Sequence, residues 1–513
     1  MNFRNLLLSQ GVATSLVAIA LTLPASLGAQ TSIAQADIES YFDTTNDLYV
    51  LNDSTSYENS GSLNFGTTSS GDNLAVGRST ADNFLTISGG TVTNYRGYIG
   101  YYSAGTGTVT VTGASSVWSN ANTFTVGYYG TGTLNIENGG SVSNTSGTIG
   151  SQSNSSGTVT VKDAGSFWTN SGNLIVGSLG TGTLNIENGG SVSNTNGYVG
   201  DNSSGTVTVT GANSTWENSG ILTVGVNRTG TLNIENGGYV SNTVGNIGGS
   251  SSVVTVRGAG SRWENTGGLY VGNSGTGSLN IENGGYVSNT SGNIGFNVSS
   301  GGTVTVRGAN STWENSGVLT VGRSGTGTLT IENGGSVSNT SCVMGRNSGS
   351  SGTVTVKGAG SSWTNTLDLF VGDSGAGTLT IENGALVTAT SVSVGSSGAI
   401  YLNGGYLALA SADATTDLAT IADLINNEKV YAMDAATGTY VLVTSWDSEN
   451  GLVSLTYYED ITTCDALDDY NLTGAYTVLT SAYHSVPEPA TYALFGGLGA
   501  LGMAMYRRRT ARK

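Results

Sequence analysis

The chain has 513 residues, of which 80 are glycine and only 10% are charged, and its formal net charge is −17. This composition is typical of a turn-rich repeat protein rather than of the three globular domains that the length alone would suggest. The acidity excludes nucleic acid as a partner, because phosphate binding requires clustered Lys and Arg. Cys342 and Cys464 lie far apart along the chain and form no CxxC or metal-ligand spacing, which excludes a disulfide framework.

Residues 1–36 are predicted to be a secretory signal peptide. Arg4 supplies the positive charge, and an apolar segment follows at 12–23. That segment is too short for a comfortable membrane span, so removal is favoured over anchoring. Small residues offer cleavage after Ala29 or after Ala36. Residues 37–48 are then expected to cap the N-terminal end of the domain that follows.

Residues 49–407 are built from one repeat. The block Leu134–Gly140, LNIENGG, returns five times with small changes. A hydrophobic residue followed by glycine marks each half-repeat, fourteen times in all, at alternating spacings of about 23 and 27 residues. Six tryptophans recur every 47 to 50 residues, at Trp118, Trp168, Trp216, Trp263, Trp313 and Trp363.

The half-repeat predicts an all-β fold. Each half holds three short stretches of alternating apolar and polar residues, separated by Gly, Asn and Ser turns. We therefore predict a right-handed parallel β-helix of about 14 coils with three strands per coil. Stacked coils are about 4.8 Å apart, which gives a rod of roughly 65–70 Å. The absence of proline between Pro24 and Pro487 agrees with this fold, because proline removes a donor from a ladder.

Alignment of the half-repeats places Trp168 over the inward Val142, so we interpret the tryptophans as core residues. A sugar-stacking surface is the alternative for six regularly spaced aromatic residues. The alignment also places Lys162 between Glu137 and Glu187, and this alternation of acids with bases or threonine continues along the chain. It disfavours shifted registers, since like charges placed opposite each other repel. We read no catalysis into these glutamates.

Residues 408–485 are predicted to form a small α+β module that covers the last coil. An amphipathic helix is expected within 415–428, on the spacing of Leu418, Ile421, Leu424 and Ile425. Strand-like segments follow at 440–444, 452–458 and 476–480. A separate ligand-binding domain is the alternative.

Residues 486–513 have the order of a membrane-sorting signal. The tripeptide Pro487, Glu488 and Pro489 precedes an apolar segment at 492–506. This segment is predicted to be a short transmembrane helix, held with its C-terminal end in the cytoplasm by Arg507, Arg508 and Arg509. An ordinary C-terminal anchor is the alternative.

This tail resembles the PEP-CTERM sorting signal. The resemblance implies that an exosortase, an integral-membrane cysteine transpeptidase-like enzyme, recognises Pro487, Glu488 and Pro489 and removes 492–513. It also implies export in a Gram-negative bacterium that makes exopolysaccharide. The central blocks at 132–140 and before Trp363 are similar to repeats of PEP-CTERM proteins and of autotransporter passenger domains. Only about a hundred residues follow the repeats, too few for an autotransporter's own translocation domain, so self-translocation is not expected.

Two function classes follow. The first is a non-enzymatic surface or matrix protein, anchored transiently in the inner membrane, whose rigid rod adheres to exopolysaccharide or cell-surface glycans. The second is a β-helical polysaccharide lyase or hydrolase, by analogy of fold alone. The enzyme is disfavoured because the repeat shows no break, the sole histidine, His484, lies beside the sorting signal, and departures such as Arg96 and Asp201 are isolated. No polar cluster on one face is evident, so we assign no catalytic, cofactor or metal residue.

Overall fold

The computed structural model describes most of the chain. The described residues are 31–32, 42–43, 48–51, 56–59, 61–68, 72–77, 82–410, 414–434, 437–444, 452–458, 467, 470, 472 and 475–481. Apart from β1 (Thr31–Ser32), the predicted signal peptide lies outside these residues, and so does the whole predicted sorting signal at 486–513.

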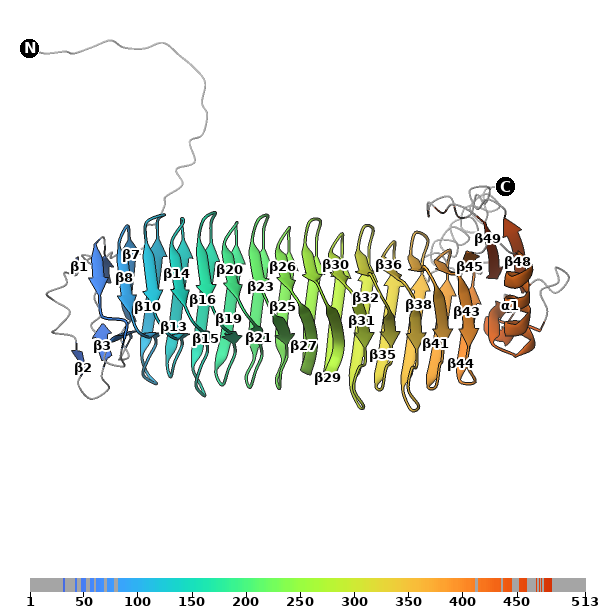
Figure 1. Ribbon diagram of the computed structural model, residues 1–513, viewed down its shortest axis with the longest axis horizontal. Helices are drawn as coiled ribbons and strands as arrows, with labels where there is room; N and C mark the ends of the chain where they lie inside the picture. The colour runs from blue at the N-terminus through green and yellow to red at the C-terminus, as the bar shows by residue number, and fades with distance from the viewer. Residues whose placement is uncertain are drawn as a thin grey trace, which may run out of the picture.

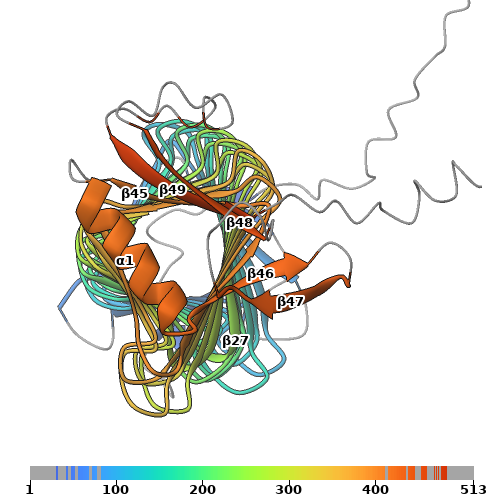
Figure 2. The same ribbon diagram turned by 90° about the vertical axis from the view of Figure 1, so that its right-hand side faces the viewer.

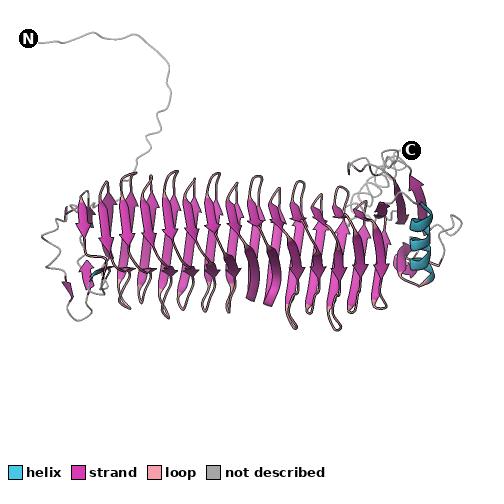
Figure 3. Ribbon diagram, viewed as in Figure 1, coloured by secondary structure: helices cyan, strands magenta, loops and turns pink. Residues whose placement is uncertain are grey.

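The fold is all-β, with 61% strand and 3% helix, and its strands wind into a rod of about 13 coils (Figure 1 and Figure 3). Near the N-terminal end, one coil consists of β7 (Asp82–Ser88), β8 (Thr91–Asn94) and β9 (Gly97–Ile99). The shorter strands β4 (Ser56–Asn59), β5 (Ser62–Asn64) and β6 (Asn73–Val76) pair with these three in parallel and form the coil before it. The last consists of β41 (Ala376–Glu382), β42 (Leu386–Ala389) and β43 (Ser391–Val394). The predicted β-solenoid is confirmed, and its right-handed sense stays a prediction from the general rule for parallel crossover connections.

We call the three strands of a coil its first, second and third strand. The first strands after β7 are β10 (Thr106–Thr112), β13 (Thr131–Glu137), β16 (Ser156–Lys162), β19 (Thr181–Glu187), β22 (Gly205–Thr210), β25 (Gly230–Glu235), β32 (Gly301–Arg307), β35 (Thr326–Glu332) and β38 (Ser351–Lys357). The second strands after β8 are β11 (Val117–Asn120), β14 (Ser141–Asn144), β17 (Phe167–Asn170), β20 (Ser191–Asn194), β23 (Thr215–Asn218), β26 (Tyr239–Asn242), β28 (Arg262–Asn265), β30 (Tyr286–Asn289), β33 (Thr312–Asn315), β36 (Ser336–Asn339) and β39 (Ser362–Asn365).

The third strands after β9 are β12 (Phe124–Val126), β15 (Gly147–Ile149), β18 (Leu174–Val176), β21 (Gly197–Val199), β24 (Ile221–Val224), β31 (Ser291–Ile294), β34 (Leu319–Val321), β37 (Cys342–Met344) and β40 (Asp368–Val371). In the middle of the rod, β27 (Val244–Arg257) and β29 (Gly268–Glu282) each join the third strand of one coil to the first strand of the next. Every strand in the coils pairs in parallel with its equivalents in the neighbouring coils.

Side chains alternate between core and solvent along each first strand. In β13, Leu134 and Ile136 point inward and are fully buried, whereas Asn135 between them is partly exposed. The strand pairing places Leu134 in register with Val109 and Val159 of the adjacent coils. Stacking of this period-2 pattern produces one apolar core that runs along the rod.

The six tryptophans are fully buried, which confirms that they fill the core. Trp168 pairs in register with Val142, and glycine in the neighbouring coil makes room for the larger ring. A Cβ atom on Gly147 would lie 2.8 Å from Cζ2 of Trp168, and Leu174 fills the equivalent position in the tryptophan coil. Coils with Trp and Leu, or with Trp118 and Phe124 in the first case, thus alternate with coils with Val and, in most cases, Gly. Cys342 stands in the glycine column and is buried.

A ladder of buried asparagines runs along the ends of the second strands. Trp168 Nε1 donates to Asn144 Oδ1 at 2.7 Å, and Asn144 Nδ2 donates to Asn170 Oδ1 at 2.6 Å. Asn170 Nδ2 then donates to the backbone oxygen of Ser193 in the next coil, at 3.4 Å. The same three bonds recur in the other tryptophan-containing units. This ladder was not predicted from the sequence.

The predicted alternation of charges is confirmed on the outer face of the first strands. Each base bonds the glutamate of the preceding coil, as in Lys162–Glu137 at 2.9 Å and Arg257–Glu235 at 2.7 Å. Arg307–Glu282 and Lys357–Glu332 repeat the contact. All of these side chains are partly exposed, and exposed ion pairs contribute only about 0–1 kcal/mol. The alternation therefore serves register more than stability.

A helix and two strand pairs cover the C-terminal end of the rod (Figure 2). The helix α1 (Ala414–Asn426) contacts β43, and its apolar residues Ile421 and Ile425 are buried, as the helical spacing predicted. The helix is shorter than the expected 415–428 because Glu428 adopts a positive φ of 59°. The strand elements are β44 (Gly398–Asn403), β45 (Tyr406–Ala410), β46 (Val430–Asp434), β47 (Thr439–Leu442), β48 (Val453–Tyr458) and β49 (Tyr476–Ser481).

Antiparallel pairing ends the ladders in this cap. β46 continues the first-strand ladder through β44 and then pairs with β47 in antiparallel fashion. β45 continues the second-strand ladder to Ala410, beyond the expected end at 407, and pairs with β49, which pairs with β48. The strands predicted at 440–444, 452–458 and 476–480 are thus present within two residues, and β46 was not predicted.

At the N-terminal end, β2 (Phe42–Asp43) and β3 (Leu48–Leu51) form an antiparallel pair. β3 joins the ladder through β6 (Asn73–Val76), which follows β4 (Ser56–Asn59) and β5 (Ser62–Asn64). This pairing agrees with a solenoid that starts near residue 49. The capping role of 37–48 stays a prediction.

Candidate functional site

The residues singled out from the sequence as sorting determinants, Pro487 to Pro489 and Arg507 to Arg509, lie outside the described residues. A different set of side chains, on the outer face of the second strands, forms the candidate site.

Outside the middle of the rod, the two outward positions of the second strands hold mostly serine and threonine, as Ser191 and Ser193 do in β20. Five consecutive second strands, β23 to β33, carry large residues there instead. They lie near the middle of the rod, where Figure 1 labels β23, β26 and β30. We call the large residues of these strands the central patch: Glu217, Tyr239, Arg262, Glu264, Tyr286 and Glu314.

The register of the ladder arranges the central patch in two columns. Tyr239, Arg262 and Tyr286 follow one another in one column, in successive coils. In the second column, the three glutamates alternate with serine, so neighbouring carboxylates are two coils, or about 10 Å, apart. This spacing limits the repulsion between them.

Hydrogen bonds tie the two columns together. The Tyr239 hydroxyl donates to Glu264 Oε2 at 3.0 Å, and the Tyr286 hydroxyl donates to Glu314 Oε2 at 2.6 Å. Arg262 forms an ion pair with Glu264, and its guanidinium lies 4.8 Å from the centre of the Tyr286 ring. The patch is therefore an ordered network whose rings and charges are held in place.

Burial raises the pKa of Tyr239 and of Tyr286 above that of an exposed phenol, and the hydrogen bonds to Glu264 and Glu314 raise each pKa further. Both hydroxyls consequently stay protonated at neutral pH and remain donors.

Two equivalent grooves flank the central patch, where second strands turn into third strands. The first has a volume of about 380 Å³ and is lined by Glu217 with Ser193 and Ser241. The second has a volume of about 390 Å³ and includes Glu314 and Ser288 at the same positions of the repeat. Among the described residues, no hydrogen bond or ion pair reaches the Glu217 carboxylate. The grooves thus present carboxylate, hydroxyl and amide groups to solvent.

The structure corrects the expectation that no polar cluster gathers on one face. The six residues of the central patch are spread over about a hundred positions of sequence, and only coil stacking brings them together. The aligned repeats did contain a sequence sign of this cluster. Three successive tryptophan blocks read Trp-Glu-Asn, at Trp216, Trp263 and Trp313, where the other copies have Ser or Thr in place of Glu.

A second surface cluster lies near the N-terminal end of the rod. Tyr98 and Tyr128 each lie within about 5 Å of Tyr101, whose ring stacks on that of Tyr128 at 5.2 Å between centres. Burial raises the pKa of Tyr101 to about 12. Arg96 lies 5.3 Å from the ring centre of its sequence neighbour Tyr95, and its charge acts on Tyr128 of this cluster.

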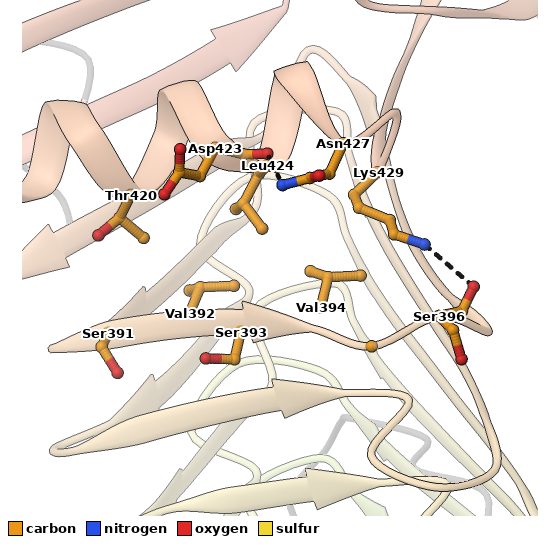
Figure 4. A pocket seen from close by; sticks show the side chains of 11 residues that line it. Ser391, Val392, Ser393, Val394, Ser396, Thr420, Asp423, Leu424, Asn427 and Lys429 are labelled. Carbon is orange, nitrogen blue, oxygen red and sulfur yellow. Dashed lines mark hydrogen bonds between the residues drawn. The ribbon is translucent and has the colours of Figure 1, made fainter.

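A cavity at the C-terminal end has a volume of about 680 Å³ and lies between β43 and α1 (Figure 4). Val392 faces Leu424 across it, and polar groups line its rim. Lys429 Nζ already donates to the backbone oxygen of Ser396 at 3.0 Å, and Asn427 Nδ2 donates to the backbone oxygen of Asp423. The Lys429 bond fixes the cap on the last coil, and the Asn427 bond closes the last turn of α1, so we interpret the cavity as a packing gap.

Within the described residues, no three His, Cys, Asp or Glu side chains converge as a metal site would require. Among the same residues, no helix has both the length and the apolar composition needed to cross a bilayer. The transmembrane helix predicted at 492–506 lies outside them.

Comparison with known proteins identifies the C-terminal segment. Residues 485–509 match the family of the PEP-CTERM protein-sorting motif. No curated protein matches the chain. Among solved structures, a fragment of TibA, hyper-glycosylated by TibC, is 17% identical with a TM-score of 0.35, over 68% of this chain and 92% of that chain. The chain is a β-solenoid with a PEP-CTERM sorting motif, which marks it as an exported protein, processed by an exosortase and sorted to the cell surface.

Proposed function

We propose that this protein is a non-enzymatic structural and adhesive rod of the cell surface or extracellular matrix, and that it adheres to exopolysaccharide or to the glycans of neighbouring cells. The observation that carries the proposal is the attachment of one continuous solenoid to a surface-sorting signal. The inner membrane is then a transient anchor in a Gram-negative host.

The continuous core of the rod and the bonds between its coils support this role. Its core is continuous from the first coil to the cap, and every coil is bonded to its neighbours by three parallel ladders and by the buried asparagines. In such an array each coil contacts only its neighbours, and the stack extends in one direction. A rod of this kind holds a binding surface at a fixed distance from its attachment point.

Processing is tested by the intact mass of the protein recovered from the surface fraction of its host, with and without the exosortase. We expect loss of the tail at 492–513, which contains Arg507, Arg508 and Arg509, only when the enzyme is present. A variant with Pro487→Ala and Pro489→Ala should keep the tail. A full-length C-terminus in the wild-type host contradicts the sorting step.

Adhesion is tested separately by deleting residues 82–410 while keeping both ends of the chain. Host cells with this deletion should lose attachment to exopolysaccharide-coated surfaces and to one another. Unchanged attachment, with normal sorting of the shortened chain, contradicts the adhesive role.

One observation favours a second candidate, the polysaccharide lyase or hydrolase. Glu264 and Arg262 form a charged pair on a surface that also carries Glu217 and Glu314. Release of new reducing ends from polysaccharide by the purified protein, abolished in Glu264→Gln, would establish this activity in place of simple adhesion.

A further inference from the structure

We propose that the central patch and its two grooves bind an uncharged polysaccharide strand, laid along the rod across β23 to β33. This inference rests on the proposed adhesive function and assigns it to one surface. The occupant is a polymer of neutral hexoses or N-acetylhexosamines, identified by the chemistry of the groups that face it.

The position of the site follows from the departure from the repeat. Outside the patch, the same two columns hold mostly serine and threonine, as in β20 and β36. The core behind the patch is the same as elsewhere, with Trp216, Val240 and Trp263 all fully buried. The larger outward residues are therefore not needed to fold these coils, and a ligand accounts for them.

The polar chemistry suits a polyhydroxylated ligand. An ionised carboxylate such as Glu217 accepts hydrogen bonds only, whereas the serine hydroxyls that alternate with the glutamates both donate and accept. Each groove therefore pairs an acceptor with groups of both kinds, which matches the vicinal hydroxyls of a sugar ring. The Glu217 carboxylate has no partner among the described residues, so it is available for such bonds.

The aromatic groups suit the apolar faces of sugar rings. Tyr239 and Tyr286 are about 10 Å apart along the axis, each half-buried and tethered through its hydroxyl to a glutamate. Rings that are fixed before binding lose little side-chain entropy on binding. Arg262, packed over Tyr286 and paired with Glu264, holds the middle of the patch in the same way.

The shape of the site indicates a polymer. The two grooves hold equivalent positions of the repeat and are four coils apart, which is roughly 19 Å along the rod. A monosaccharide cannot contact both grooves. A linear chain parallel to the axis meets Glu217, Glu264 and Glu314 in turn.

The charge of the site selects the class of polysaccharide. The central patch has three carboxylates and one guanidinium, a local charge of −2, on a chain whose net charge is −17. Like charges repel over a Debye length of about 8 Å at physiological ionic strength, so polymers of uronic acids or sulfated sugars are disfavoured. An uncharged glycan has no such penalty.

The experiment uses the processed protein from the surface fraction of its host, immobilised and exposed to three probes: oligomers of glucose, oligomers of N-acetylglucosamine, and alginate. We expect at least one of the two uncharged probes to bind and alginate not to bind. Stronger binding of alginate than of both uncharged probes would overturn the assignment of ligand class. The assignment would also be overturned if neither uncharged probe bound.

The site is tested by the triple variant Tyr239→Ser, Glu264→Ser, Tyr286→Ser. Serine occupies the same columns at Ser191 and Ser241, so the repeat tolerates it and the variant should fold. Binding should weaken at least tenfold. The matched control is Phe167→Ser, which removes an exposed aromatic residue from the same column outside the patch and should bind like wild type.

The outcomes separate this inference from the adhesive function. If the triple variant binds glycan as wild type does while the rod still mediates attachment of cells, the site is wrong and the function stands. If deletion of the whole solenoid leaves attachment unchanged, the adhesive function fails whatever the patch binds.

Discussion

The indole nitrogen of Trp168 donates a hydrogen bond to the side-chain oxygen of Asn144, one coil earlier, and both groups are buried. The same asparagine uses its nitrogen to bond Asn170 in the tryptophan coil. Buried polar groups require partners, so each tryptophan and the asparagine before it depend on each other. The two-coil period is thus set by hydrogen bonds between tryptophan and asparagine as well as by the packing of large residues against small ones.

Substitution of Asn242 by alanine tests this dependence. The change removes the acceptor for Trp263 Nε1, at 2.7 Å, and the donor to Asn265 Oδ1, at 2.6 Å. A buried group left without a partner costs about 1–3 kcal/mol, so we expect a loss of about 2–5 kcal/mol in the free energy of unfolding by urea. The exposed neighbour Thr243→Ala should lose less than about 1 kcal/mol. Equal losses would contradict a special role for the ladder.

The complementarity of Trp216 and Gly197 predicts coupled effects. Trp216→Val leaves a cavity and should cost about 3–5 kcal/mol. Gly197→Ala places a Cβ against Asn218 Oδ1, 2.8 Å from Trp216 Cζ2 and 2.9 Å from Leu222 Cδ1, and should cost about 1–3 kcal/mol through overpacking. Because the smaller valine removes the indole contact and leaves space into which Asn218 and Leu222 can shift, the double variant should be at least about 1 kcal/mol more stable than the sum of the single losses predicts. Strict additivity in thermal or urea unfolding would refute the coupling.

Reversal of the charge at Lys162 should destabilise the rod through its first-strand ladder. Lys162→Glu places a carboxylate between Glu137 and Glu187, and we expect a loss of about 1–2 kcal/mol that shrinks at high salt. Lys162→Thr is the matched control, since Thr210 occupies the equivalent position two coils later, and it should cost less than about 1 kcal/mol. A loss that is independent of salt would point to packing instead.

The same ion pair predicts a pH dependence at high pH. The hydrogen bond and the charge of Glu137 raise the pKa of Lys162 above its ordinary value of 10.5. A raised pKa in the folded state means that the stabilisation is complete below pH 10.5 and is lost as pH rises through the folded-state value. The stability difference between wild type and Lys162→Thr should therefore be constant from about pH 7 to 9 and vanish in strong alkali.

The cap is held to the last coil by Tyr440, whose hydroxyl donates to Glu382 Oε1 at 2.7 Å. Glu382 ends the charge ladder, and the tyrosine takes the place of the missing next base. Tyr440→Phe should destabilise the cap by about 1.5–3 kcal/mol, the range for hydrogen bonds to charged groups. Hydrogen exchange should accelerate in β46 and β47 and stay unchanged in the middle coils, whereas an even acceleration along the rod would contradict a local effect.

The solenoid itself was predictable because its pattern is local and repeated. Alternating residues in each strand, glycine at each turn and a fixed spacing of Trp168 and its equivalents define coils and register without any long-range information. The helix at Ala414–Asn426 was also visible, since its apolar spacing is contained in four turns.

The asparagine ladder and the central patch were not predictable by the same means. Asn144 precedes a turn and carries the signature of a turn residue, so its burial emerges only once a tryptophan of the next coil lies against it. Likewise, Tyr239 and Glu264 are 25 residues apart and meet through diagonal contacts between coils. Such contacts depend on which side chains share an outer face, and the sequence pattern constrains the inner face far more tightly.

The alternation of Trp–Leu coils with Val–Gly coils also restricts how the length of this rod can change in evolution. Gain or loss of a single coil would set two bulky layers or two hollow ones against each other. Gene duplication or deletion is therefore tolerated in steps of two coils, which lengthen or shorten the protein by about 10 Å each. The distance at which the rod holds its outer surface from its attachment point can consequently change in fixed increments, while the cross-section and the cap of the rod remain the same.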